Sequence, residues 1–209
     1  MIILANCLIF VYLHLAGGLE PWRYQAYLAQ FGLVPARFFS RELFSFSGPV
    51  PVVLTPIAAM FLHGNLLHLA GNMLYMWIFG NNVEDYLGHV RFTIFYFITG
   101  LAASAAFMIF SPFSHYPMVG ASGAIAGVLG AYFILWPRAR IKTLVFLFIF
   151  ITTLEIPAVI VLGFWIIIQI LEGFSSVGRS TGIAWFAHIG GFFAGILLIL
   201  PAARRKRRR

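Results

Sequence analysis

Charged residues are scarce in this sequence of 209 residues: they make up 10% of it, and only six are acidic. A soluble domain is about a quarter charged, so we expect a lipid bilayer rather than water around most of the chain. Cysteine is nearly absent as well. Cys7 is the single one, which excludes an intramolecular disulfide and a cysteine-based metal cluster.

The surplus of positive charge is concentrated at one end. The net charge is +8, and six of the fourteen basic residues lie within 204–209, directly after an apolar stretch. Such a cluster is typical of a cytoplasmic anchor beside anionic lipid. We therefore expect membrane lipid, and no nucleic acid, to be the partner of this segment.

The beginning of the chain lacks the features of a cleaved signal peptide. It has no basic n-region, and no Ala-x-Ala site follows its apolar run. The first span is also short, ending before Gly17-Gly18. We interpret it as clipped, with a natural start further upstream.

Several stretches are apolar enough to cross the hydrocarbon, which takes about 20 residues. We place six spans at 1–16, 57–79, 92–110, 122–136, 156–172 and 182–200. The segment 17–55 is too polar to span and too aromatic for a bare loop, so we expect it at the interface. Short connectors follow at 80–91, 111–121, 137–142 and 173–181. The pattern predicts an all-α polytopic membrane protein of one domain (1–209), with a core of about 56–200 and a basic tail at 201–209.

The apolar run 143–172 is long enough to hold one span or two. The basic residues after the fourth span and those at 204–209 place both of these ends inside. With both ends on the same side of the membrane, only one crossing fits within 143–172. Residues 143–155 are then predicted to be an interfacial or half-inserted lead-in, and both termini to be cytoplasmic.

Ser122 opens the fourth span, which is short for a membrane. Its roughly fifteen residues cover about 22 Å, less than the roughly 30 Å of the hydrocarbon core. Ser122 should then lie within the membrane thickness, where irregular backbone lines a wet cavity or is buried in protein. A simple helix N-cap is the alternative role for this serine. Gly120 and Gly123 bracket it and allow close backbone approach.

His188 lies in the last span, where an ionisable side chain usually faces a cavity or a partner. A structural role, in which His188 only forms a hydrogen bond with a backbone carbonyl of a neighbouring helix, is the alternative. Small residues on the two spans permit tight packing; they are Gly123, Gly127 and Gly130 on the fourth and Gly190, Gly191 and Gly195 on the last. This packing can bring His188 within reach of Ser122, as a base that activates a hydroxyl nucleophile.

His68 and Asn72 stand four residues apart on the second span and share one helix face. His63 is five residues before His68, and we expect it on a different face. A metal site is the rival interpretation, but the spacing and the acidic residue of zinc proteases are lacking. An imidazole and an amide suit oxyanion stabilisation better, because both can donate hydrogen bonds.

Together these motifs closely resemble those of the rhomboid intramembrane proteases. They are a histidine and an asparagine four apart on the second span, GxSG opening the fourth, and AHxxG in the sixth. In this sequence they read His68 and Asn72, Gly120-Ala121-Ser122-Gly123, and Ala187-His188-Ile189-Gly190, with a further similar pattern at Gly80, Glu84 and Gly88. The match runs in order from about Pro56 to Leu200.

The resemblance implies a six-helix rhomboid-like bundle with a Ser122–His188 dyad and no aspartate. The oxyanion would be held by the Ser122 N–H with His68 and Asn72. Gly191 and Gly195 would pack the sixth helix on the fourth. Transmembrane proteins would be the substrates, and the 173–181 loop a mobile cap. No cofactor or metal is implied.

Two positions depart from the family pattern. Leu54-Thr55 stand where members often carry Trp-Arg, and Ala126 stands where an aromatic residue often stacks on the catalytic histidine. The imidazole must therefore be oriented by another group.

The predicted function is thus that of a multi-pass intramembrane serine endopeptidase, and the resemblance implies a bacterial cell membrane as its location. A silent rhomboid relative that binds clients is one alternative. A small transporter is another, but the sequence has no internal repeat.

Overall fold

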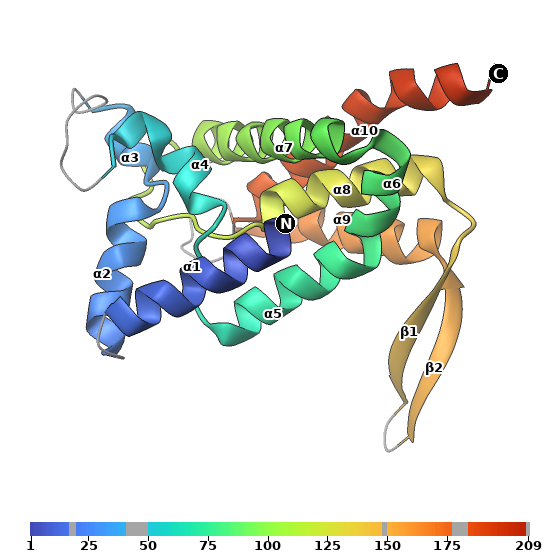
Figure 1. Ribbon diagram of the computed structural model, residues 1–209, viewed down its shortest axis with the longest axis horizontal. Helices are drawn as coiled ribbons and strands as arrows, with labels where there is room; N and C mark the ends of the chain where they lie inside the picture. The colour runs from blue at the N-terminus through green and yellow to red at the C-terminus, as the bar shows by residue number, and fades with distance from the viewer. Residues whose placement is uncertain (17–19, 41–49, 148–149, 177–183, 208–209) are drawn as a thin grey trace.

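The computed structural model describes residues 1–16, 20–40, 50–147, 150–176 and 184–207. Most of these residues are helical, and the longer helices follow the long axis of the molecule in alternating directions (Figure 1). They are α1 (Ile2–Ala16), α5 (Leu66–Tyr75) continued by the π-helix η2 (Met76–Gly80) and by α6 (Asn81–Leu87), α7 (His89–Phe110), α8 (Ser122–Leu135), α9 (Ala158–Ser175) and α10 (Trp185–Arg207).

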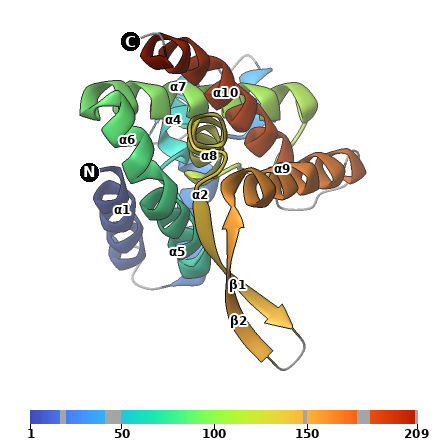
Figure 2. The same cartoon turned by 90° about the vertical axis from the view of Figure 1, so that its right-hand side faces the viewer.

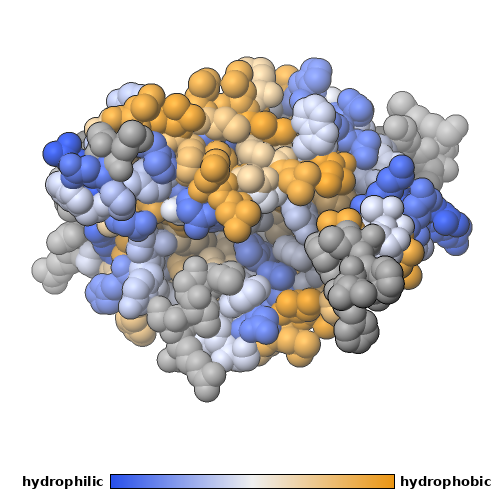
Figure 3. Space-filling model, turned by 90° about the horizontal axis from the view of Figure 1, so that it is seen from below, coloured by the Kyte–Doolittle hydropathy of each residue, from blue (hydrophilic) through white to orange (hydrophobic). Residues whose placement is uncertain are grey.

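Three helices of the described residues are long and apolar enough to cross a membrane: α7, α9 and the first part of α10. Large apolar side chains on them face outward, among them Ile94, Phe164 and Leu197 with exposed fractions of 54%, 65% and 69%. Figure 3 shows hydrophobic residues over broad areas of one face. A soluble monomer rarely exposes so much apolar surface, and the molecule has the exterior of an integral membrane protein.

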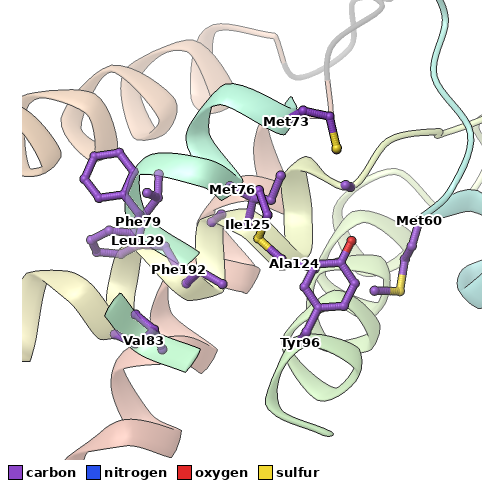
Figure 4. Packing of buried hydrophobic residues seen from close by; sticks show 14 of the residues in the cluster. Met60, Met73, Met76, Phe79, Val83, Tyr96, Ala124, Ile125, Leu129 and Phe192 are labelled. Carbon is purple, nitrogen blue, oxygen red and sulfur yellow. The ribbon is translucent and has the colours of Figure 1, made fainter. Parts of the chain in front are cut away.

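Helix α8 lies at the centre of the bundle. Figure 2 shows it end-on, with α5, α7, α9 and α10 around it. Every residue from Gly123 to Tyr132 is buried, as expected for a helix that is apolar on all sides. Its side chains Ile125 and Leu129 belong to one hydrophobic cluster with Met76 and Phe79 of η2 (Figure 4).

The second span differs from its predicted limits of 57–79. Residues Thr55–Ala59 form a separate short helix, α4, and the chain is irregular until α5 begins at Leu66. The Asn65 side chain caps α5 by accepting a hydrogen bond from the His68 backbone N–H at 2.8 Å, because the first helical N–H groups lack acceptors. The helical run then continues through the predicted connector to Leu87, where Gly88 breaks it with a φ of 80°.

The predicted all-α fold needs correction at 143–155, the segment interpreted as a lead-in to the fifth span. The chain forms an antiparallel hairpin there, with β1 (Arg140–Leu147) and β2 (Phe150–Pro157) in a register that sets Lys142 opposite Glu155. Figure 1 shows this hairpin projecting away from the helices. The strands are rich in β-branched and aromatic residues, which favour extended backbone. They lead directly into α9, the single helix of the 143–172 run.

The first loop carries helices of its own, within its described parts. They are α2 (Pro21–Phe31), α3 (Pro35–Phe38) and the 3-10 helix η1 (Val52–Leu54). Tyr24 of α2 is 5% exposed, and its hydroxyl donates a hydrogen bond to the His63 carbonyl. Burial raises the pKa of Tyr24 to about 12, so the hydroxyl remains a donor at neutral pH. This bond ties the first loop to the segment before α5.

Residues 201–207 of the predicted basic tail are helical. Helix α10 continues through Pro201 as far as Arg207. At the other end of the bundle, most of the predicted loop 173–181 lies outside the described residues, and 173–175 belong to the last turn of α9.

Candidate active site

Ser122 is the first residue of α8 and does not cap it. Ala121 occupies the N-cap position, which makes no side-chain capping bond. The turn before the helix depends on Gly120, whose φ of 124° is rarely adopted by other residues. The Gly120 N–H donates to the Ala59 carbonyl at 2.9 Å. The Ser122 hydroxyl is therefore available for another partner.

The short length of α8 recesses this serine in the bundle. The helix has 14 residues, or about 21 Å at 1.5 Å per residue. α7, with 22 residues, is about 33 Å long by the same rise. The residue after Ser122, Gly123, packs against Ala103, well before α7 ends at Phe110, so Ser122 lies below the end of its neighbour.

His188 comes from the first turns of α10 and faces Ser122. Its Nε2 lies 2.8 Å from the Ser122 Oγ, within the range of a hydrogen bond. The two residues are 66 positions apart in the chain, and both are partly buried. The structure thus brings together the two residues that the motifs predict as nucleophile and base.

Close approach of α8 and α10 makes this distance possible. A Cβ on Gly191 would lie 2.0 Å from the Gly123 carbonyl oxygen, and one on Gly195 would lie 1.9 Å from that of Gly127. A Cβ on Gly130 would lie 2.1 Å from the Phe192 carbonyl oxygen. Any side chain at these positions would push the two backbones apart.

The remaining glycines of the predicted packing set have other neighbours. Gly123 and Gly127 turn their own Cα hydrogens toward α7, where a Cβ would lie 2.6 Å from the Cβ of Ala103 and 2.3 Å from that of Thr99. Gly190 also faces α7. Gly120 faces a side chain of α5, because a Cβ there would lie 2.9 Å from the Nε2 of His68. With its bond to Ala59, Gly120 thus lies where α4 and α5 meet the start of α8.

The His68 imidazole has a defined set of hydrogen-bonding roles. Its Nδ1 accepts a hydrogen bond from the Gly64 N–H at 3.2 Å. In a neutral imidazole the other nitrogen then carries the proton, so Nε2 is a donor, and it lies beside Gly120 at the entrance to α8. Asn72 is 7% exposed, and its Nδ2 donates to the His68 carbonyl at 2.9 Å. An amide nitrogen has two hydrogens, so it can donate once more.

His63 does not lie where the helix-face argument puts it. The residue precedes α5, so its direction does not follow from the rotation of about 100° per residue within a helix. It is fully buried, and its ring meets that of His68 edge-on with centroids 5.2 Å apart. A substitution of His63 is therefore expected to disturb His68.

One residue of the site is missing from the sequence-based prediction. Gln169 of α9 is 5% exposed, and its Oε1 lies 2.7 Å from the Nδ1 of His188. The available signal was a single amide in an otherwise apolar part of the fifth span. The partner across the bundle could not be read from the sequence.

One cavity of about 560 Å³ joins the predicted site residues. Its wall includes His68, Asn72, Gly120, Ser122 and His188. Apolar side chains such as Met60, Leu129 and Trp165 complete it. A water molecule occupies about 30 Å³ in the liquid, so the cavity has room for both water and part of a substrate. The arrangement can support acyl transfer by a serine nucleophile.

Known proteins match this chain over most of its length. The model of the rhomboid domain matches residues 52–205. Rhomboid protease GluP of Bacillus subtilis is 38% identical over 151 residues, covering 72% of this chain and 26% of that protein. Mitochondrial Rhomboid protein 1 of Saccharomyces cerevisiae is 28% identical over 183 residues, covering 83% of this chain and 49% of that protein.

RHOMBOID-like protein 4 of Arabidopsis thaliana is 33% identical over 148 residues, covering 68% of this chain and 32% of that protein. The chain thus spans between about a quarter and a half of the length of these relatives. With a domain match across nearly three quarters of its residues, the chain belongs to the rhomboid family.

Proposed function

We propose that this protein is an intramembrane serine endopeptidase that cleaves transmembrane proteins. The observation that carries the proposal is the 2.8 Å contact between the Ser122 Oγ and the His188 Nε2 at the recessed end of α8. A free hydroxyl is a weak nucleophile and becomes reactive when an adjacent base takes its proton. Relatives named as rhomboid proteases support the assignment.

In the proposed reaction, the Ser122 oxygen attacks the carbonyl carbon of the scissile bond as its proton passes to His188 Nε2. The tetrahedral intermediate collapses, the C–N bond breaks, and His188 returns the proton to the departing amine. Water then attacks the acyl-enzyme with His188 again as base, and Ser122 is released. No cofactor enters this sequence.

Three hydrogen-bond donors support the proposed reaction as partners for the oxyanion of the intermediate. The Ser122 N–H has no acceptor within its own helix, since it lies in the first turn of α8. The His68 Nε2 and the second Asn72 amide hydrogen belong to the same cavity. We assign these three groups to the oxyanion, where such donors usually contribute much of the rate enhancement.

Six crossings, with both termini in the cytoplasm, agree with the course of the chain. The segments α1, α5 to α6, α7, α8, α9 and α10 alternate in direction along one axis (Figure 1). The C-terminal end of α10 and the hairpin end of the bundle carry Arg138, Arg140, Lys142 and Arg204. The relatives come from a bacterium and from mitochondria, so they do not single out the predicted bacterial cell membrane.

The direct test is cleavage of a single-span membrane protein by the purified chain in detergent or vesicles. Ser122→Ala and His188→Ala should each abolish cleavage while the protein stays folded, because nucleophile and base act as one unit. A fluorescent phosphonate should label the wild-type protein and not Ser122→Ala. Substantial cleavage by either variant would disprove the dyad. A wild-type protein that binds such substrates but neither cleaves them nor reacts with the phosphonate would be a client-binding relative instead.

A further inference from the structure

Gln169 is a buried polar residue on a helix that otherwise turns apolar residues toward the bundle. The interior-facing positions of α9 around it are Leu162 and Ile166, and Gln169 itself is 5% exposed. Burying an amide without hydrogen bonds costs a few kcal/mol. A partner is therefore needed at this position, and the identity of the partner decides what the amide does.

The hydrogen bonds of Gln169 determine which way its amide points. Its Nε2 donates to the Trp165 carbonyl one turn earlier, at 3.4 Å, and its Oε1 lies 2.7 Å from the Nδ1 of His188. An amide oxygen can only accept, so the His188 Nδ1 must donate. The Nε2 of a neutral His188 then has no hydrogen and can accept from the Ser122 hydroxyl at 2.8 Å.

This arrangement supplies what a general base requires. A histidine that is to take the serine proton must present an unprotonated Nε2, and in serine proteases of the trypsin type a buried aspartate on Nδ1 holds that tautomer. Here the group on Nδ1 is a neutral amide from a neighbouring helix. It can fix the tautomer and the ring orientation, although it lacks the negative charge that stabilises an imidazolium.

The group that fixes the tautomer and orientation of His188 comes from α9. Ala126 of α8 is buried, with its Cβ 3.4 Å from the position of a Cβ on Gly191. On the α9 side the Trp165 ring lies 5.9 Å from the His188 ring, tilted by 37°. Trp165 and Gln169 therefore both approach the imidazole from α9, whereas Ala126 belongs to α8.

We propose that Gln169 is the positioning residue of the dyad, holding His188 in the tautomer and orientation that accept the Ser122 proton. The inference rests on the proposed function and adds a third member to its machinery. It also makes the alignment of the dyad depend on a side chain of α9, which itself carries neither reacting group.

The test uses the full-length protein with Gln169→Leu, and with Gln169→Met as a second apolar variant should the first fold poorly. We expect kcat for a transmembrane substrate to fall about 10- to 100-fold, or about 1.4 to 2.7 kcal/mol, with KM nearly unchanged. Labelling of Ser122 by a phosphonate should slow in parallel. Gln169→Glu keeps an acceptor oxygen at the same reach and should recover most of the activity. Ile166→Leu, a volume-conserving change one turn away on α9, should leave activity unchanged.

A nitrogen-15 NMR measurement on histidine-labelled protein separates positioning from mere packing. In the wild type the proton should reside on the His188 Nδ1, and in Gln169→Leu the two tautomers should mix. Wild-type kcat, labelling rate and tautomer in a folded Gln169→Leu variant would overturn the proposal. If Ser122→Ala is inactive in the same assay, only the role of Gln169 fails; if Ser122→Ala cleaves as well, the proposed function fails first.

Discussion

Replacing Gly195 by alanine tests whether the close approach of α8 and α10 sets the geometry of the dyad. The new Cβ would lie 1.9 Å from the Gly127 carbonyl oxygen and 2.6 Å from its carbonyl carbon. Weak C–H···O contacts in proteins have C···O distances of about 3.3 Å, so α10 has to move away from α8 by roughly 1 Å or more. Both neighbours are backbone atoms, which cannot rotate out of the way.

The displacement should affect stability and reactivity together. Overpacking a well-packed interface typically costs about 1 to 3 kcal/mol, and a backbone clash belongs at the upper end. His188 stands about two turns from Gly195 on the same helix, so it moves as α10 moves. A misplacement of about 1 Å can cost roughly 100-fold in rate, and the 2.8 Å bond between His188 and Ser122 would be lost or lengthened.

Two measurements on purified protein follow this change: the temperature of unfolding in detergent, and the rate of Ser122 labelling by a phosphonate. Both should fall in Gly195→Ala. Gly163→Ala on α9 is the matched control, because its Cβ would meet only the edge of the Phe133 ring at 3.9 Å, an ordinary contact, and alanine is the better helix former. If Gly195→Ala unfolds and reacts like the wild type, the helices do not approach as described and the packing argument is wrong.

Three further predictions concern topology, the oxyanion and the first loop. In a background lacking Cys7, an impermeant thiol reagent outside the cell should label Ser176→Cys and not Arg207→Cys; equal labelling of both would contradict the six crossings. Asn72→Ala should slow turnover of a transmembrane substrate by up to about 100-fold while the nucleophile still reacts with a phosphonate, and unchanged turnover would exclude Asn72 from the oxyanion site. The pKa of Tyr24 is raised to about 12 from 10.0, so its contribution to stability is complete below pH 10 and is lost as the pH rises from 10 toward 12. Thermal unfolding of Tyr24→Phe should show a weaker decline over that interval than the wild type, and an identical decline would assign it to other groups.

The second span shows where hydropathy alone falls short. The stretch 57–79 is mostly apolar, yet the helix begins at Leu66 because Asn65 caps it. Hydropathy records how much of a segment prefers lipid and contains no information on which N–H groups find acceptors. For the same reason the helix-face argument for His63 failed, since that residue precedes the helix and packs against His68.

The hairpin at 140–157 was missed for a related reason. A short apolar run is compatible with a buried helix and with a strand, and periodicity does not separate them. The β-branched residues of Phe150–Pro157 were a signal for a strand. Pairing with Arg140–Leu147 satisfies the backbone groups that the two segments turn toward each other, and that pairing is a property of two strands together.

The sequence by itself determined the membrane setting, the family resemblance and the identity of Ser122, His188, His68 and Asn72 as candidates. Each of these depends on composition or on residues close together in the chain. Only the tertiary structure decided that Gln169 meets His188, and that Gly120 lies against the His68 side chain. Such contacts join residues on different helices, and their distances follow from how closely the backbones pack, which no local pattern along the chain records.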